Sequence, residues 1–101
     1  MARRAVDNSD LHRWRSLNAT DVLVVLADYA KRDLTFVPRN DPHTTRWHAM
    51  LGDLHFELLC TGPKFWNTRS NKGGGGAVDL AMHLLNVGFK QATRTLRDRG
   101  L

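Results

Sequence analysis

The chain is poor in cysteine and proline, with one and three residues of each, and it has no long apolar run. A single cysteine excludes an internal disulfide, which fits the reducing cytoplasm. No apolar segment approaches the roughly 20 residues that a helix needs to cross a bilayer, and the N-terminus has no apolar signal region. We therefore expect a cytoplasmic protein without membrane contacts.

Positive charge is what the chain has in excess. Its 101 residues carry a formal net charge of +5 at pH 7. This length allows a single domain with one buried core. The charge favours a polyanionic partner, so nucleic acid is the first class of ligand to consider.

Residues 1–18 form a basic, polar segment that we expect to be partly mobile, as far as about Asp10. Trp14 lies between Arg13 and Arg15 in this segment. Such a tryptophan either stacks on a base, beside arginines that contact phosphates, or pins the segment to the domain. The domain itself is predicted to span residues 19–101.

The pattern of apolar residues after this segment predicts an α+β domain. Thr20 is a candidate N-cap, and apolar residues at helical spacing predict a helix to about Lys31. Short strands are expected at residues 34–37 and 64–68, on either side of a hairpin. Two helices follow, the first ended by Gly88. We therefore expect a small antiparallel sheet of three to four strands, packed with an N-terminal helix and two C-terminal helices.

The hairpin at residues 45–60 has a register fixed by its two-residue turn, because glycine supplies the positive φ that such turns need. The turn places Trp47 opposite Leu58 on an apolar face and His48 opposite Glu57 on a polar face. A slip of one residue would bury the two polar side chains, so this register is strongly specified. The predicted core comprises Leu23, Leu26, Trp47, Phe56, Leu58, Leu80, Leu84, Phe89 and Leu96.

The run FWNTRSNKGGGGAVDL at residues 65–80 is the most informative part of the sequence. An aromatic strand leads into a basic, glycine-only loop, and the loop opens into an amphipathic helix. Together with GAVDLAM at 76–82 and FKQATRTL at 89–96, it resembles the zinc-binding domain of bacterial and phage DNA primases. The resemblance covers roughly residues 20–101. The resemblance implies a role in replication. Similar versions of this domain without zinc look typical of proteins from plasmids and integrative elements.

The primase domain holds zinc with three cysteines and a histidine, whereas this chain has Cys60 alone. His43, His48 and His55 are near in sequence, and zinc accepts both residue types. In the predicted register, however, His48 and His55 lie on the polar face and Cys60 on the apolar face. We therefore expect no metal and no cofactor, with a buried thiol and histidines that face solvent.

The glycine run admits two interpretations. It is either a flexible connection in place of the zinc knuckle, or a place where a nucleic-acid backbone approaches closely, flanked by Arg69 and Lys72. A nucleotide pocket is disfavoured, because no Gly-Lys-Ser/Thr follows the glycines. Asp79 and His83 lie one helical turn apart, and we expect a pair facing solvent. No nucleophile accompanies them, so we expect no enzyme.

Phe65 and Trp66 are adjacent on a strand and must point to opposite faces of the sheet. One is expected in the core. The other is then an exposed ring beside cations, unless the helices cover both. An exposed aromatic ring beside a basic track is the combination that holds single strands of nucleic acid.

The sequence therefore predicts a non-catalytic nucleic-acid-binding module that acts in replication, priming or transfer of a mobile element. Single-stranded DNA is the favoured ligand, with Trp66 stacking on a base and phosphates at Lys64, Arg69 and Lys72, and with Arg46 as a further candidate. The alternative is a protein-interaction adaptor that docks a replicative polymerase, primase or helicase protein.

Overall fold

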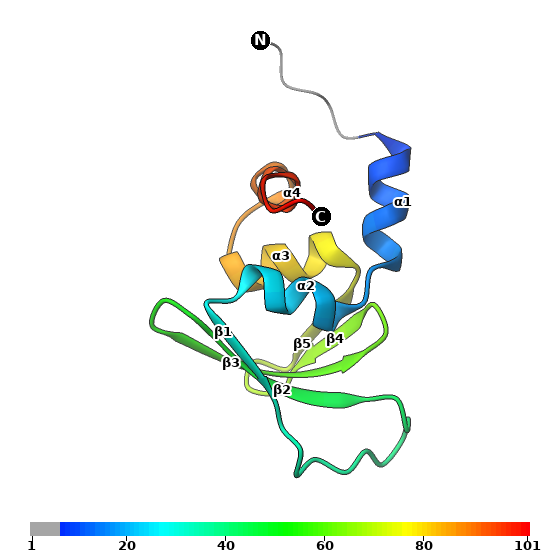
Figure 1. The fold of residues 1–101 in the computed structure, drawn as a ribbon, viewed down its shortest axis with the longest axis vertical. Coiled ribbons are helices and arrows are strands. Elements are labelled where there is room, and N and C mark those ends of the chain that lie inside the picture. Colours follow the sequence, from blue (N-terminus) through cyan, green and yellow to red (C-terminus); the bar gives the residue numbers. More distant parts are fainter. Residues whose placement is uncertain (1–6) are drawn as a thin grey trace.

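The fold is that of a computed structural model, of which residues 7–101 are described (Figure 1). The helices are α1 (Asn8–Ser16), α2 (Ala19–Leu26), α3 (Ala77–Leu85) and α4 (Phe89–Asp98). The strands are β1 (Tyr29–Arg32), β2 (Thr45–Leu51), β3 (Leu54–Thr61), β4 (Lys64–Asn67) and β5 (Lys72–Gly75). The predicted α+β class is confirmed. The sheet is one strand larger than the upper prediction, with five antiparallel strands in the order β1-β2-β3-β4-β5.

The predicted hairpin register is confirmed at every pair, including Trp47 with Leu58 and His48 with Glu57. Gly52 has a φ of 57° in the turn, a conformation that favours glycine. Alternation along the strands then gives the sheet two chemically different faces. We call the face with Ala49 and Leu58 the inner face, and the face with His48 and Glu57 the outer face.

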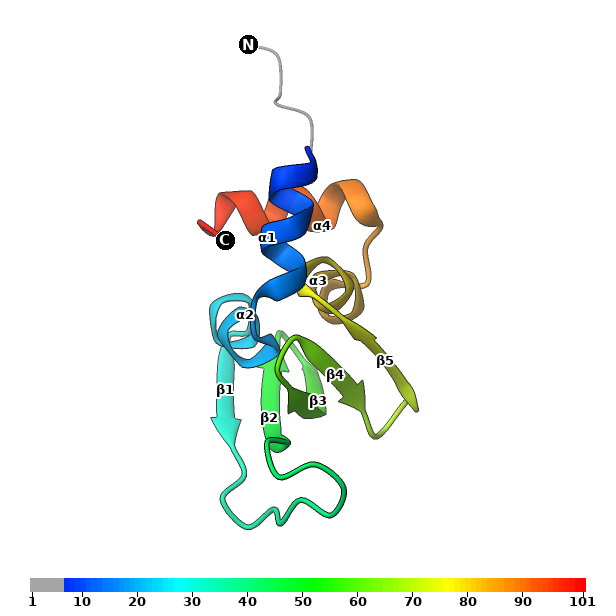
Figure 2. The ribbon, with the colours of Figure 1, turned by 90° about the vertical axis from the view of Figure 1, so that its right-hand side faces the viewer.

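The helices lie in layers on the inner face. Figure 2 shows α2 and α3 above the sheet, with α4 and α1 beyond them. Most of the predicted core is buried, and burial of each leucine contributes about 1.5–3 kcal/mol. The fully or nearly fully buried members of the predicted set are Leu23, Leu26, Leu58, Leu80, Leu84 and Leu96. Trp47 and Phe56 are partly buried and pack against this core.

Phe89 was predicted in the core, and this prediction is wrong because its side chain is 46% exposed. Phe89 is the first residue of α4 and lines a cleft of about 310 Å³ beside α1, with Leu11 and Met82. Gly88 does not end α3 either. The helix ends at Leu85, and its C-cap Asn86 adopts the left-handed conformation with a φ of 53°.

The first helix of the predicted domain is shorter than expected. It ends at Leu26, and Asp28 N–H then donates to the carbonyl of Met50 and draws the chain into the sheet as β1. The strand predicted at residues 34–37 is a loop in the structure. Asp33 accepts hydrogen bonds from the backbone N–H and hydroxyl of Thr35, which turns the chain there.

The N-terminal segment is helical from Asn8, where a mobile chain was predicted as far as about Asp10. The Asp7 carboxylate accepts from the N–H of Asp10 at 2.9 Å and caps α1. Residues 1–6 of the predicted mobile segment lie outside the described residues. The cap of α2 is Asn18 rather than Thr20. Over the residues that the structure describes, no helix is long and apolar enough to span a membrane.

Candidate nucleic-acid interface

Within residues 7–101, no helix covers the outer face of the sheet, and this face presents the aromatic ring and several of the cations that the sequence singled out. Phe65 is 5% exposed and Trp66 is 44% exposed, so the predicted opposition of the two rings is confirmed. Trp66 pairs with Leu59 on β3 and Gly73 on β5. Lys64 lies on the same face two residues earlier, with its side chain exposed.

The indole of Trp66 lies across the backbone of β5. A Cβ atom at Gly73 would come within 2.7 Å of indole Cε3 and 2.6 Å of the Phe65 carbonyl oxygen. Glycine at this position therefore allows the ring to pack against the strand. The exposed part of the ring is open to a ligand.

A groove of about 730 Å³ runs beside this ring, between the β3–β5 part of the outer face and the loop that joins β1 to β2. Leu59 and Trp66 line it from the sheet, and Phe36 lines it from the loop. Two exposed cations, Lys64 and Arg39, border it from opposite sides. An apolar hollow between cations can accept a flat aromatic group while its charged backbone stays at the rim.

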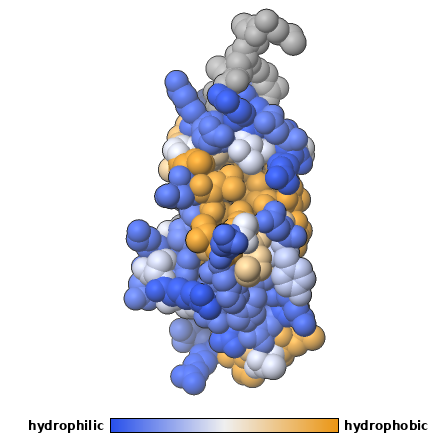
Figure 3. Space-filling model, turned by 90° about the vertical axis from the view of Figure 1, so that its left-hand side faces the viewer, coloured by the Kyte–Doolittle hydropathy of each residue, from blue (hydrophilic) through white to orange (hydrophobic). Residues whose placement is uncertain are grey.

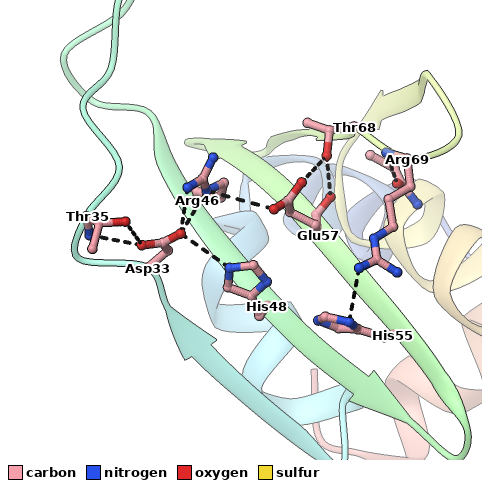
Figure 4. A network of polar contacts seen from close by, with 9 residues as sticks. Asp33, Thr35, Arg46, His48, His55, Glu57, Thr68 and Arg69 are labelled. Carbon is pink, nitrogen blue, oxygen red and sulfur yellow. Dashed lines mark hydrogen bonds and ion pairs between the residues drawn. The ribbon is translucent and has the colours of Figure 1, made fainter.

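A polar network fixes the loop over the sheet (Figure 4). Arg46 donates to the Asp33 carboxylate through Nε and Nη2, at 2.9 and 2.7 Å, and its guanidinium lies 5.2 Å from the ring centre of Phe36. His48 also contacts Asp33, at 3.3 Å. Hydrogen bonds from Thr35, followed by those from Arg46, hold the pKa of Asp33 well below its usual range. Arg46, predicted as a phosphate contact, is thus engaged within the protein and supports the groove wall.

The second half of this network surrounds Glu57. Its carboxylate accepts from the hydroxyl of Thr68 at 2.6 Å, and this bond is the largest cause of its lowered pKa. The nearby charges of Arg46 and Arg69 lower the pKa of Glu57 further. Arg69 also contacts Nδ1 of His55 at 3.3 Å and remains exposed. Arg69 therefore lies at the border of the outer face, where it already contacts the side chain of His55.

The glycine run is a strand, not the loop that both interpretations assumed. Residues Lys72–Gly75 form β5, and Lys72 pairs with Asn67, which is buried on the inner face. Lys72 therefore lies on the opposite face of the sheet from Trp66. The two residues were predicted to contact the same strand of nucleic acid, but the fold does not bring them together. A smaller hollow of about 430 Å³ adjoins Lys72, Asp79 and His83.

Asp79 and His83 were expected to pair, and each has another partner instead. The Asp79 carboxylate accepts from Gly75 N–H at 3.1 Å, and His83 Nε2 lies 2.8 Å from the side-chain nitrogen of Asn67. Burial lowers the pKa of His83, and the charge of Lys72 lowers it further. The neutral imidazole can then accept the hydrogen bond from Asn67.

Trp14 is fully buried in the core, so its ring is not available to stack on a base. Of the two interpretations of this residue, the structure shows that it pins the N-terminal helix. Arg13 beside it contacts the C-terminal carbonyl of Leu101 at 3.1 Å, while Arg15 is exposed near Gly76. The predicted cluster around Trp14 therefore lies in the helical layers, away from the outer face.

Cys60 is buried on the inner face, and burial raises its pKa to about 12. His48 and His55 lie on the outer face, with ring centres 5.6 Å apart, as the register predicted. Across residues 7–101, no three histidine, cysteine or acidic side chains converge in a way that could hold a metal ion.

The loop of residues 33–44 is also part of the site, although it was not predicted from the sequence. Phe36 and Arg39 lie there, the first within the strand predicted at residues 34–37 and the second just after it. The signal that could have found them is Asp33, whose carboxylate can fold a short turn and pair with an arginine on the neighbouring strand.

Comparison with known proteins identifies no family for this chain. No family model matches the chain, and no solved structure matches it. One curated relative, a "65 kDa protein" from Zymomonas mobilis subsp. mobilis, is 41% identical over 44 residues, which is 44% of this chain and 8% of that protein. The match therefore covers less than half of this chain and a small part of that relative, whose name states only its mass.

Proposed function

We propose that this domain is a non-catalytic module that binds single-stranded nucleic acid, with single-stranded DNA favoured, across the outer face of its sheet. The observation that carries the proposal is the exposed indole of Trp66, which borders the groove beside Lys64. A base stacked on such a ring is bound with little regard to sequence, while phosphates meet nearby cations. The replication or mobile-element context rests on the resemblance to the primase domain.

The exposed indole of Trp66, beside cations, supports a single strand rather than a duplex. Lys64 and Arg39 border the groove, and Arg69 lies further along the same face. Glu57 and Asp33 are also on this side, but both are engaged with cations or hydroxyl groups of the protein. A strand with unstacked bases can lay one base against Trp66 while its backbone follows the cations, whereas bases of a duplex are stacked on one another.

The test is a titration of labelled single- and double-stranded oligonucleotides of the same sequence at two salt concentrations. We expect tighter binding of the single strand and a steep loss of affinity with salt, since each phosphate contact releases counterions. Lys64→Ala and Arg39→Ala should each flatten the salt dependence by about one phosphate contact. Asp53→Ala, at the exposed turn of the β2–β3 hairpin, is the control that should bind at least as well as the parent.

The second candidate function is an adaptor that docks a replication protein. Figure 3 shows an apolar area on the side of the molecule where the helices meet the sheet, and Val24 and Leu54 are large apolar side chains with more than half of their surface exposed. Such surfaces are typical of protein interaction sites. Absence of oligonucleotide binding at low salt would contradict the nucleic-acid proposal and leave this one in its place.

A further inference from the structure

Strand β5 is an edge strand of the sheet, and in Figure 2 it borders open space on the side away from β4. The N–H of Gly76 donates to the carbonyl of Pro63 at 3.0 Å, which extends the β4–β5 ladder by one pair. Donors alternate along an antiparallel strand, so the N–H groups of Gly73 and Gly75 point away from β4. Gly75 N–H donates to Asp79, in agreement with this direction. The N–H and C=O groups of Gly73 therefore face outward from the edge.

The glycines of this edge are only partly explained by the fold itself. A Cβ at Gly73 would clash with Trp66, and one at Gly74 would lie 3.0 Å from the Asp79 carboxylate. At Gly75 the nearest atom would be 3.9 Å away, so the fold does not require glycine there. Three successive residues carry no side chain, and the outward N–H and C=O groups of Gly73 are a template for another strand.

We propose that β5 pairs with β5 of a second copy of this chain, antiparallel, with Gly73 opposite Gly73 of the second copy. In an antiparallel ladder, two such outward-pointing residues exchange a pair of N–H···O=C bonds. The two-fold axis is then perpendicular to the sheet, so the contact is isologous and closed. The two five-stranded sheets become one continuous sheet, with both outer faces on the same side.

Charge complementarity selects this register. With Gly73 at the centre, Lys72 lies opposite Gly74 of the second copy, and both positions belong to the inner face. The Asp79 carboxylate lies over Gly74 on that face, because a Cβ atom built at Gly74 would be 3.0 Å from a carboxylate oxygen of Asp79. Lys72 of each copy therefore meets Asp79 of the other. Both side chains are exposed, and they border the smaller inner-face hollow.

The outer face complements the contact. Each Trp66 indole lies across its own Gly73. When the two Gly73 residues pair at the spacing of neighbouring strands, about 5 Å, the two indoles approach one another. Their exposed edges can then cover each other, which gives the interface an apolar centre above the paired backbones. Two indoles side by side would also join the two grooves along one surface.

Sedimentation velocity over a range of protein concentrations tests this proposal without nucleic acid. We expect the mass to rise from that of the 11.5 kDa chain toward twice that value. Lys72→Glu places two acidic groups together and should abolish the rise. Asp79→Asn, which keeps an oxygen acceptor for Gly75 N–H, should weaken it. Lys31→Glu makes the same charge change on β1 at the other edge of the sheet and should leave the dimer unchanged.

Amide hydrogen exchange supplies a second readout. Protection of the Gly73 amide should increase with protein concentration in the parent and not in Lys72→Glu, while circular dichroism confirms that the variant is folded. A chain that stays monomeric at millimolar concentration would overturn the proposal. A dimer that survives Lys72→Glu without protection of Gly73 would overturn it as well. Neither outcome depends on whether the outer face binds nucleic acid.

Discussion

The indole of Trp66 lies across the backbone of Gly73, so an exposed aromatic ring of the outer face is supported by the most glycine-rich strand of the sheet. The two residues are opposite each other on β4 and β5. The ring packs against a strand that has almost no side chains. The candidate site and the sheet edge therefore depend on the same pair.

Gly73→Ala should destabilise the protein, because its methyl group would meet the Phe65 carbonyl at 2.6 Å and the Trp66 ring at 2.7 Å. Overpacking of this kind costs about 1–3 kcal/mol. Gly75→Ala is the matched control, since its nearest neighbour is 3.9 Å away. Chemical denaturation of both variants would measure the difference in unfolding free energy. Equal stability of the two would contradict the described placement of the indole.

The Asp33–Arg46 contact should make stability depend on pH in the acid range. The pKa of Asp33 is lowered in the folded protein, so ionised Asp33 contributes stability above its ordinary pKa of 3.8, and this contribution is lost as pH falls below that value. The unfolding free energies of the parent and Asp33→Asn should therefore converge as the pH drops below about 4. Thr35→Val, which removes the hydrogen bond that lowers this pKa most, should show a smaller pH dependence than the parent. A constant difference between parent and Asp33→Asn down to pH 2 would argue against the network.

Cys60 should be unreactive in the folded protein, because it is buried and its pKa is raised to about 12. The thiolate is the reactive form, so a thiol reagent at pH 8 should label the native chain slowly and the denatured chain quickly. The ratio of the two rates reports opening of the inner face. Rapid labelling of the native protein would contradict the burial of this residue.

The sequence predicted those parts of the fold where side chains alternate strongly. The β2–β3 register and the opposite directions of Phe65 and Trp66 follow from period-two patterning and a glycine turn. Strand β5 was missed because glycines show no alternation and have low strand propensity, and its pairing with β4 is a tertiary effect.

Two other elements were missed for different reasons. Helix α1 is polar, and it is held by the cap at Asp7 and by burial of Trp14, neither of which produces an apolar stripe in the sequence. Strand β1 follows α2 directly and contains Ala30 and Lys31, which are good helix formers, so the helical pattern continued past its true end. Within the site, Lys64 and Trp66 were predicted, while Arg39 depends on the path of a loop that only the tertiary structure defines.

The most direct test of the account is the affinity of single-stranded DNA for the parent and for Trp66→Ala, measured by fluorescence anisotropy over a range of salt concentrations. Loss of the stacking ring should weaken binding by roughly 1–3 kcal/mol and leave the salt dependence nearly unchanged. Val24→Ala, another exposed apolar residue, should bind like the parent. If Trp66→Ala also binds like the parent, the outer face is not the nucleic-acid site.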